Sequence, residues 1–282
     1  MNRLDDFPPH AQTNRAHWNR HAEDWRQIGR CGWRRRQPAW GNWEIPNTEL
    51  PLLPDDLSGL DAIDLGCGAG QVCFWMHQRG ARSVVGIDPS ERQLEIARAL
   101  AVEYRVELEL IHGVAEAVPR PDATFDFALS EYGASVWADP LIWIPEAWRL
   151  LRPGGRLSFI GRSTLSLVCA PPDDGPIGTT LQRDWFGLQR VALGPQEDPY
   201  VVFNLPISEW FALFRRIGFV VDDFYEVRAP ASATGQRFET PADWARRFPS
   251  EQAWRLSKPQ GSCQGPPSTA IVDNPTKDAY SI

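Results

Sequence analysis

Three glycines at alternate positions stand directly after a short apolar segment, in the run Asp64-Leu65-Gly66-Cys67-Gly68-Ala69-Gly70. Glycine permits a tight turn and lets a ligand approach the backbone, and the start of a following helix offers free N–H groups. Asp88 ends a second apolar run 22 residues beyond Gly66, where its carboxylate can accept hydrogen bonds from both hydroxyls of a ribose. Either feature alone is also explained by a structural turn or a solvated acid. Together they predict that a nucleoside-like ligand binds at this edge of a sheet.

Two residues distinguish between the cofactor classes that such an edge accepts. A dinucleotide fingerprint counted from Gly66 requires glycine at position 71, where the sequence has Gln71. Asp64 precedes the first glycine by two positions, and its carboxylate would repel a pyrophosphate but could hold an ammonium group. S-adenosylmethionine (SAM) has an amino-acid end and a ribose and carries no phosphate. The run therefore favours SAM over a nicotinamide dinucleotide.

The elements that must position these residues alternate between strand and helix from Leu60 onward. Such alternation predicts parallel strands joined by right-handed crossovers, in a doubly wound α/β sheet. Apolar runs predict strands near 61–65, 83–88, 107–112, 125–130 and 156–161, and later strands near 218–227 and 253–258. Helical patterns fall near 71–79, 90–104, 145–151, 207–218 and 241–247.

Composition divides the chain into three parts. Residues 1–50 are expected to form an N-terminal helix, marked by Trp18, Ala22, Trp25 and Ile28, and an irregular aromatic lid segment. Residues 51–258 form the main domain, with excursions at 163–205 and 229–251 on the substrate side. Residues 259–282 are rich in Pro, Gly, Ser and Thr and are expected to form a flexible tail, and residues 1–13 look loosely attached.

Charge and composition exclude several classes of protein. With 29 basic and 36 acidic residues the chain has a net charge of −7, which argues against a general nucleic-acid partner. Arg34, Arg35 and Arg36 form the one dense basic run, and such a run is usually a solvated surface. The chain has no apolar stretch of membrane-spanning length and no signal-peptide pattern, so a cytoplasmic protein is expected, as monomer or homodimer. Five cysteines without metal-ligand spacing suggest neither a disulfide framework nor a zinc cage.

As a set, the motifs between about Leu60 and Gly161 resemble those of the class I SAM-dependent methyltransferases, especially the small-molecule type. The glycine loop, Asp88, the run HGVAEAVP at 112–119, the strand FDFALS and the turn LLRPGG at 150–155 follow the family order. The resemblance implies a Rossmann-like seven-stranded sheet of order 3-2-1-4-5-7-6 whose last strand is antiparallel. It implies SAM as cofactor, with the methionine end on the glycine loop, the ribose on Asp88 and the adenine near Pro89. The cofactor-binding residues expected on this basis are Asp64, Leu65, Gly66, Cys67, Gly68, Gly70, Asp88, Pro89, Gln93, Val114, Ala115, Glu116 and Ser130. Many relatives have an acid at the position of Val114 to accept the adenine amino group, so Glu116 or a backbone carbonyl must substitute here.

The resemblance places the strand end at Ser130, Glu131 and Tyr132 opposite the sulfonium. If the acceptor loses a proton, His21, Glu131 and Tyr132 are the catalytic candidates. His17 and His21 are four residues apart on the expected helix and could form a metal pair, but no third ligand has suitable spacing, so no metal is expected. Packing or surface roles explain these histidines equally well.

Tryptophans on both sides of the core are candidates for the substrate pocket. Trp25, Trp40, Trp43 and Trp185 are expected to form an aromatic lid for an apolar or planar substrate. Trp210, Phe211 and Phe214 have helical spacing that is more typical of a core.

The function expected is transfer of a methyl group from SAM to O, N or C of a small metabolite. Three alternatives stay open: an RNA or protein methyltransferase, a non-catalytic SAM-binding regulator, and, more distantly, an oxidoreductase. Neither the acceptor nor the methylated atom follows from the sequence.

Overall fold

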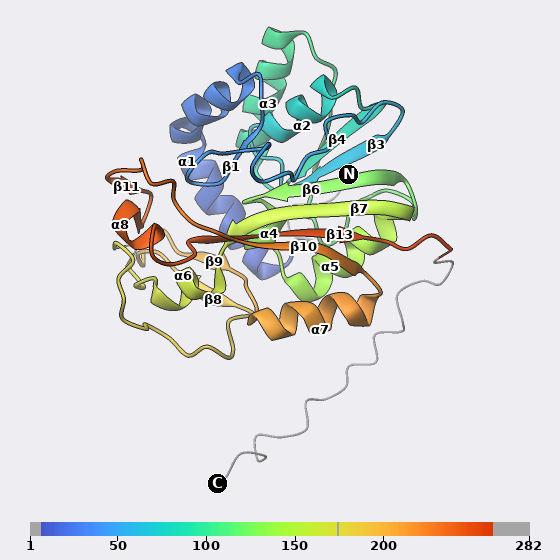
Figure 1. Ribbon diagram of the computed structural model, residues 1–282. Helices are drawn as coiled ribbons and strands as arrows, with labels where there is room; N and C mark the ends of the chain where they lie inside the picture. The colour runs from blue at the N-terminus through green and yellow to red at the C-terminus, as the bar shows by residue number, and fades with distance from the viewer. Residues whose placement is uncertain (1–6, 174, 262–282) are drawn as a thin grey trace.

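A seven-stranded sheet lies at the centre of the computed structural model, which describes residues 7–173 and 175–261 (Figure 1). Its order is β5-β4-β3-β6-β7-β13-β10, and β13 runs antiparallel to both neighbours. Numbered along the chain, this is the predicted order 3-2-1-4-5-7-6, which is confirmed. The strands are β3 (Asp61–Leu65), β4 (Ser83–Asp88), β5 (Glu109–His112), β6 (Phe125–Glu131), β7 (Leu151–Arg162), β10 (Val220–Val227) and β13 (Glu251–Ser257).

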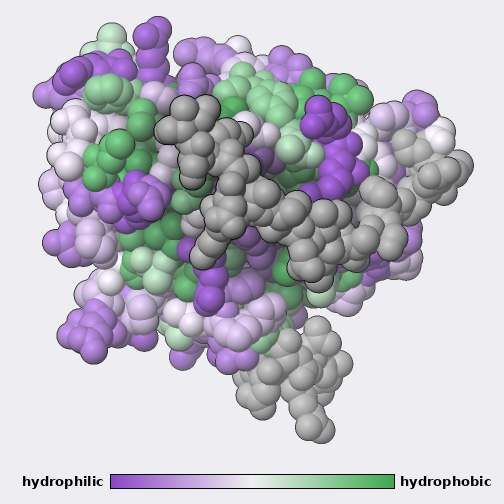
Figure 2. Space-filling view, turned by 90° about the horizontal axis from the view of Figure 1, so that it is seen from below, coloured by the Kyte–Doolittle hydropathy of each residue, from purple (hydrophilic) through white to green (hydrophobic). Residues whose placement is uncertain are grey.

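Helices cover the two faces of this sheet in separate layers. On one face α2 (Gln71–Gln78) and α3 (Glu91–Tyr104) pack with α1 (Pro9–Arg34), and on the other α5 (Pro140–Leu150) packs with α7 (Ile207–Ile217) (Figure 1). Central strands covered on both sides read as continuous apolar runs, as the SVVGID and FDFALS segments do. Trp210 and Phe214 are buried as their spacing predicts, whereas Phe211 is exposed. Seen from the side of α7, apolar residues are scattered among polar ones (Figure 2).

Two boundaries in the second half of the core differ from those predicted. The helix predicted at 145–151 begins at Pro140, because Asp139 accepts a hydrogen bond from the N–H of Leu141 and Pro140 occupies the first turn. Pro145 lies inside this helix instead of beginning it. The strand predicted at 156–161 begins at Leu151, since the Pro-Gly-Gly run forms a bulge within β7.

The N-terminal helix is longer than its apolar spacing indicated. α1 spans 26 residues, and Phe7 and Ala11 pack against Val114, so the prediction that residues 7–13 are loosely attached was wrong. Ile28, predicted on the buried stripe, is 44% exposed. Polar residues of α1 form tertiary contacts that hydrophobic periodicity does not register: the side chain of Asn14 donates to the carbonyl of Val201 and accepts from its N–H. Residues 1–6 and 262–282, the latter holding most of the predicted tail, lie outside the described residues.

Both excursions follow parallel strands, so they lie at the carboxyl edge of the sheet, where α1 also passes (Figure 1). The first, after β7, holds α6 (Thr164–Cys169), β8 (Val191–Leu193) and β9 (Tyr200–Val202). The second, after β10, holds β11 (Gln236–Arg237), β12 (Thr240–Pro241) and α8 (Ala242–Ala245). The short α4 (Ala134–Trp137) follows β6 at the same edge. None of the helices in the described part of the chain is long and apolar enough to cross a membrane.

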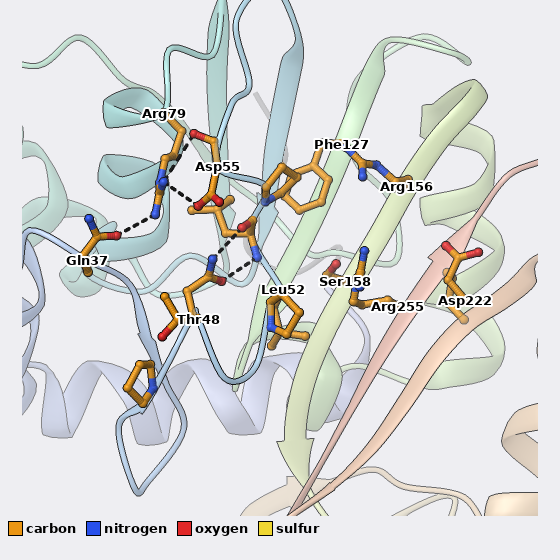
Figure 3. A pocket seen from close by; sticks show the side chains of 16 residues that line it. Gln37, Thr48, Leu52, Asp55, Arg79, Phe127, Arg156, Ser158, Asp222 and Arg255 are labelled. Atoms are coloured by element: carbon orange, nitrogen blue, oxygen red, sulfur yellow. Dashed lines mark hydrogen bonds and ion pairs between the residues drawn. The ribbon is translucent and has the colours of Figure 1, made fainter.

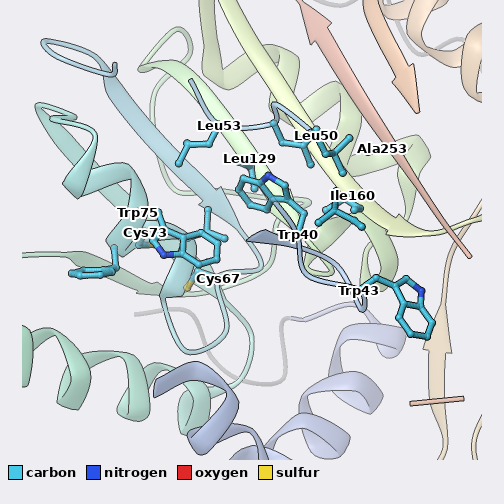
Figure 4. Close-up of a cluster of buried hydrophobic side chains, with 14 of the residues drawn as sticks. Trp40, Trp43, Leu50, Leu53, Cys67, Cys73, Trp75, Leu129, Ile160 and Ala253 are labelled. Atoms are coloured by element: carbon cyan, nitrogen blue, oxygen red, sulfur yellow. The ribbon is translucent and has the colours of Figure 1, made fainter. Parts of the chain in front are cut away.

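The segment between α1 and β3 forms a small hairpin, β1 (Ala39–Trp40) with β2 (Ile45–Pro46), and then crosses the sheet. Figure 4 shows Trp40 beside Trp75 within a buried apolar cluster. Trp40 is fully buried and donates to the side chain of Asn47, while Trp43 donates to Ser250 Oγ. Two of the four rings predicted to line the substrate pocket, Trp40 and Trp43, are therefore part of the hydrophobic core.

Candidate active site

The glycine loop joins β3 to α2 and lies against the end of β4. The N–H groups of Gly66 and Cys67 both donate to the carbonyl of Ile87. Gly66, Gly68 and Gly70 have φ angles of 85°, 48° and 78°. A Cβ at Gly66 would lie 2.5 Å from Gly133 Cα, whereas a Cβ at Gly68 would meet nothing within 4 Å. Gly66 is therefore required by the packing of the loop on the β6–α4 turn, and Gly68 borders open space.

Asp88 connects this loop to the end of β4. Its Oδ2 accepts from the Gly68 N–H at 2.9 Å, and its Oδ1 accepts from the Ser90 N–H at 2.8 Å. Burial raises the pKa of Asp88 to about 6, although both backbone bonds favour the ionised form. Each carboxylate oxygen retains a second lone pair, so Asp88 can still accept from two hydroxyls.

One carboxylate oxygen of Asp64 lies in the protein interior without a hydrogen-bond partner. Its side chain is buried, the Cys73 thiol donates to Oδ2 at 3.6 Å, and Oδ1 has no hydrogen-bond partner. Burial, and next the nearby Glu131 carboxylate, raise the pKa of Asp64 well above its usual range. An unsatisfied buried acceptor is costly, on the order of 1–3 kcal/mol, and a cationic N–H donor would remove that cost.

The remaining predicted cofactor residues lie around the same edge, but several are already engaged. Ser130 Oγ donates to the Leu65 carbonyl and accepts from the Ser135 N–H, which fixes the end of β6 against the loop. Glu116 Oε1 lies 2.8 Å from His10 Nε2 and accepts from the Asp139 N–H, so its contact with an adenine would have to compete with these partners. Six others are buried: Leu65, Cys67, Gly70, Gln93, Val114 and Ala115. Pro89 lies between Asp88 and α3.

Two carboxylates flank the β1–β2 hairpin beyond the glycine loop. Glu131 accepts from the Gly41 N–H and from Gln71 Nε2, both at 3.0 Å. Glu251 is fully buried, and its Oε1 accepts from the Asn42 N–H and the Tyr132 hydroxyl, both at 2.8 Å. Loss of hydration raises the pKa of each carboxyl to about 7, and in Glu251 the charge of Glu131 adds to the shift. The predictions included Glu131 and Tyr132 but not Glu251, which is adjacent to them only through the antiparallel placement of β13.

Partly exposed aromatic rings from four segments meet on the other side of this edge. Trp18 of α1 contacts Trp137 with centroids 5.0 Å apart, and Trp137 contacts Tyr200 of β9 at 5.5 Å. Trp25 stacks on Phe238, between β11 and β12, at 5.3 Å. We call Trp18, Trp25, Trp137, Tyr200 and Phe238 the aromatic wall. Of the predicted pocket tryptophans, Trp25 belongs to this wall, and Trp185 is 39% exposed on the first excursion.

His21 contacts a residue distant in the sequence. Its Nε2 lies 2.5 Å from Asp198 Oδ2, and His17 Nδ1 lies 3.1 Å from Asp198 Oδ1. The β8–β9 turn therefore supplies a third side chain that could bind a metal, which the sequence alone did not reveal.

A cavity of about 530 Å³ lies elsewhere, between residues 46–55 and the face of the sheet (Figure 3). Phe127, Ser158 and Arg255 form its floor, and Arg79 pairs with Asp55 at its rim. None of its lining residues belongs to the glycine loop, the carboxylate pair or the aromatic wall. It is therefore separate from the candidate active site.

The fold and the edge just described define a Rossmann-like domain for a nucleoside that carries a positively charged end. Comparison with known proteins extends this definition. Residues 63–159 match the methyltransferase-domain family. A ubiquinone biosynthesis O-methyltransferase of Dinoroseobacter shibae is 31% identical over 178 residues, which cover 58% of this chain and 71% of that protein. A demethylmenaquinone methyltransferase of Lactococcus lactis is 39% identical over 38% of this chain, and the match spans less than half of that protein, 44%. The crystal structure of an S-adenosylmethionine-dependent methyltransferase from Mesorhizobium loti shares the fold, with a TM-score of 0.59 and 23% identity over 74% of this chain and 95% of that one.

The chain belongs to the SAM-dependent methyltransferases, and SAM is its cofactor. The residues present fit that group. The unsatisfied Asp64 Oδ1 suits an ammonium donor, the open space at Gly68 allows close approach to the backbone, and Asp88 can accept from a ribose.

Proposed function

We propose that this enzyme methylates a hydroxyl group of a small aromatic or planar molecule, bound between the glycine loop and the aromatic wall. The wall is the observation that carries this proposal, because its rings come from α1, α4 and both excursions and lie next to the cofactor edge. Flat apolar ligands bind well against such rings. The names of both curated relatives refer to quinones, which supports the same chemical class.

When bound, SAM supplies a methyl group activated by a positively charged sulfur. The chain's task is then to orient the reactants, exclude water and handle one proton. Asp64 would hold the ammonium group of SAM and Asp88 its ribose. α1 covers the glycine loop, where Trp33 Nε1 donates to the Ala69 carbonyl at 2.9 Å. A hydroxyl acceptor loses its proton as its oxygen gains the methyl group.

Glu131 is the residue we assign to receive that proton. It lies at the end of β6, where Gly41 and Gln71 fix its carboxylate, and a pKa of about 7 is suited to proton transfer near neutral pH. Tyr132 is a weaker candidate, because burial and the neighbouring Glu251 carboxylate raise the pKa of its hydroxyl well above the usual range. His21, the third catalytic candidate, pairs with Asp198.

A panel of acceptors tests this assignment. Purified enzyme is incubated with SAM labelled in the methyl group and with hydroxylated aromatics, aliphatic alcohols, amines, tRNA and a protein extract. We expect label in the hydroxylated aromatics, and less of it when Trp25 is changed to Ala. Label confined to RNA, protein or aliphatic amines would contradict the proposal, and tight SAM binding without transfer to any acceptor would favour a regulatory protein.

A further inference from the structure

Two histidines and one aspartate form a cluster between α1 and the β8–β9 turn. His17 and His21 lie one helical turn apart on α1, with ring centroids separated by 4.7 Å. Asp198 faces both, with Oδ1 3.1 Å from His17 Nδ1 and Oδ2 2.5 Å from His21 Nε2. One ligand-type atom from each residue lies within 4.8 Å of the other two. Ligands separated in this way can be bound by one ion with metal–ligand distances of about 2.0–2.2 Å.

The types of ligand and their spacing are those of a transition-metal site. Two imidazoles at i and i+4 of a helix present their nitrogens on one face, and a carboxylate from a distant segment completes a three-ligand set. Imidazole nitrogens favour zinc and its neighbours over magnesium or calcium, which prefer oxygen. His17 and Asp198 have side chains that are 15% and 16% exposed, so the cluster is shielded without being closed.

A carboxylate also stands behind one of the imidazoles. Asp24 Oδ2 lies 3.6 Å from His21 Nδ1, the nitrogen that does not face Asp198. A metal-bound histidine commonly donates its second N–H to such a carboxylate, which fixes the ring orientation. Asp24 is thus placed to act in this way with a small adjustment of its exposed side chain.

One group competes with a metal at this cluster. Arg20 Nη1 pairs with Asp198 Oδ1. The Arg20 side chain is 50% exposed, so it can turn into solvent when a cation takes its place on Asp198. Arg20 therefore weakens metal binding at Asp198 but does not block it.

We propose that His17, His21 and Asp198 bind one divalent transition-metal ion of the zinc class, which ties α1 to the β8–β9 turn. Because the two segments also carry Trp18 and Tyr200, the metal fixes one side of the aromatic wall. Three protein ligands leave at least one coordination position for water or another oxygen ligand. This proposal does not depend on the identity of the methyl acceptor.

Zinc titration of the chelator-treated full chain by calorimetry tests the site, with Co²⁺ absorption as a second measure of the ligands. We expect one equivalent to bind with a Kd of micromolar or below, and His21→Ala and Asp198→Asn to weaken binding at least 100-fold. Arg20→Ala should tighten binding several-fold. His77→Ala, at an exposed histidine outside the cluster, and Cys31→Ser, at an exposed thiol, should leave binding unchanged.

Thermal unfolding separates loss of ligands from loss of fold. Zinc should raise the melting temperature of the wild-type protein and of His77→Ala but not that of a folded His21→Ala variant. Absence of stoichiometric zinc binding, or equal affinity in wild type and His21→Ala, would overturn the proposal. Equal zinc affinity in wild type and Asp198→Asn would show that Asp198 is not a ligand.

Discussion

The cofactor side and the acceptor side of the active site are built in different ways. The cofactor side comes from one stretch of sequence, from Asp64 to Glu131, in which consecutive parallel strands end at neighbouring positions. The acceptor side combines α1 with α4, β9 and the β11–β12 turn. The first is held by backbone hydrogen bonds such as those from the N–H groups of Gly66 and Cys67 to the carbonyl of Ile87, and the second mainly by contacts between side chains.

The carboxylates of the site show the same contrast, and two of them lie at the junction where the two sides meet. Asp64 and Asp88 lie on the cofactor side and are positioned by the strands themselves. Glu131 and Glu251 contact the β1–β2 hairpin, so their surroundings depend on a segment from outside the parallel core.

The largest effect is expected from Gly68→Val, on the cofactor side. A side chain there would enter the open space next to the loop and require a positive φ, so SAM binding measured by calorimetry should fall below detection. Gly59→Val is the matched control, because Gly59 also has a positive φ and open surroundings but lies away from the loop. Normal SAM affinity in a folded Gly68→Val variant would disprove the position assigned to the cofactor.

Glu131→Gln tests the junction. The amide keeps the shape of the side chain but cannot accept a proton, so kcat should fall by about 100-fold or more while SAM affinity changes little. The wild-type rate should rise with pH through about 7 as Glu131 ionises, and this rise should be absent in the variant. A pH profile that keeps the rise would assign the proton to another group.

Asp88→Ala should weaken SAM binding by about 10- to 100-fold, because hydrogen bonds to a charged acceptor contribute roughly 1.5–3 kcal/mol. Since the pKa of Asp88 is about 6, wild-type affinity should fall as pH is lowered from 7.5 to 5, and the variant should lose most of this dependence. Calorimetry at both pH values measures the effect. Unchanged affinity would mean that the ribose binds elsewhere.

The smallest effect on cofactor binding and catalysis is expected from Glu251→Gln, whose main consequence concerns stability. The pKa of Glu251 is about 7 in the folded protein against 4.5 ordinarily, so the folded state holds more protons between these values. The unfolding free energy therefore decreases as pH rises through this window. A neutral glutamine avoids that loss, so the variant should be more stable than wild type by about 3 kcal/mol at pH 8 and nearly equal at pH 4.5. Urea unfolding at the two pH values decides this, and a variant less stable at pH 8 would contradict it.

Elements set by local pattern were predicted well from the sequence. The strands followed from alternating apolar runs, and their order from the resemblance. The boundaries that failed were those where local signals mislead: the Pro-Gly-Gly run of β7 forms a bulge instead of a stop, and Pro145 lies within α5. α1 was predicted too short because His10 and Asn14 are polar residues buried by distant partners.

The tryptophans show what the sequence could not predict on the acceptor side. Trp40 and Trp43 lie in a segment with many prolines and glycines, which suggested a lid, yet both rings are buried in the core. Helical spacing links Trp18 and Trp25, but no spacing in the sequence links them to Trp137 and Phe238, with which they form the wall. Composition gives the number of aromatic rings but not which of them face each other.

The sequence by itself determined the glycine loop and Asp88, because each depends on residues close in the chain, and the resemblance to a known family supplied the order of the strands. Only the tertiary structure decided that Glu251 joins Tyr132 and that Asp198 joins His17 and His21. These contacts join residues 119 and up to 181 positions apart, and the folding of the excursions over the sheet brings them together. Pairing across such separations depends on the packing of the whole domain, and no local pattern of residues encodes it.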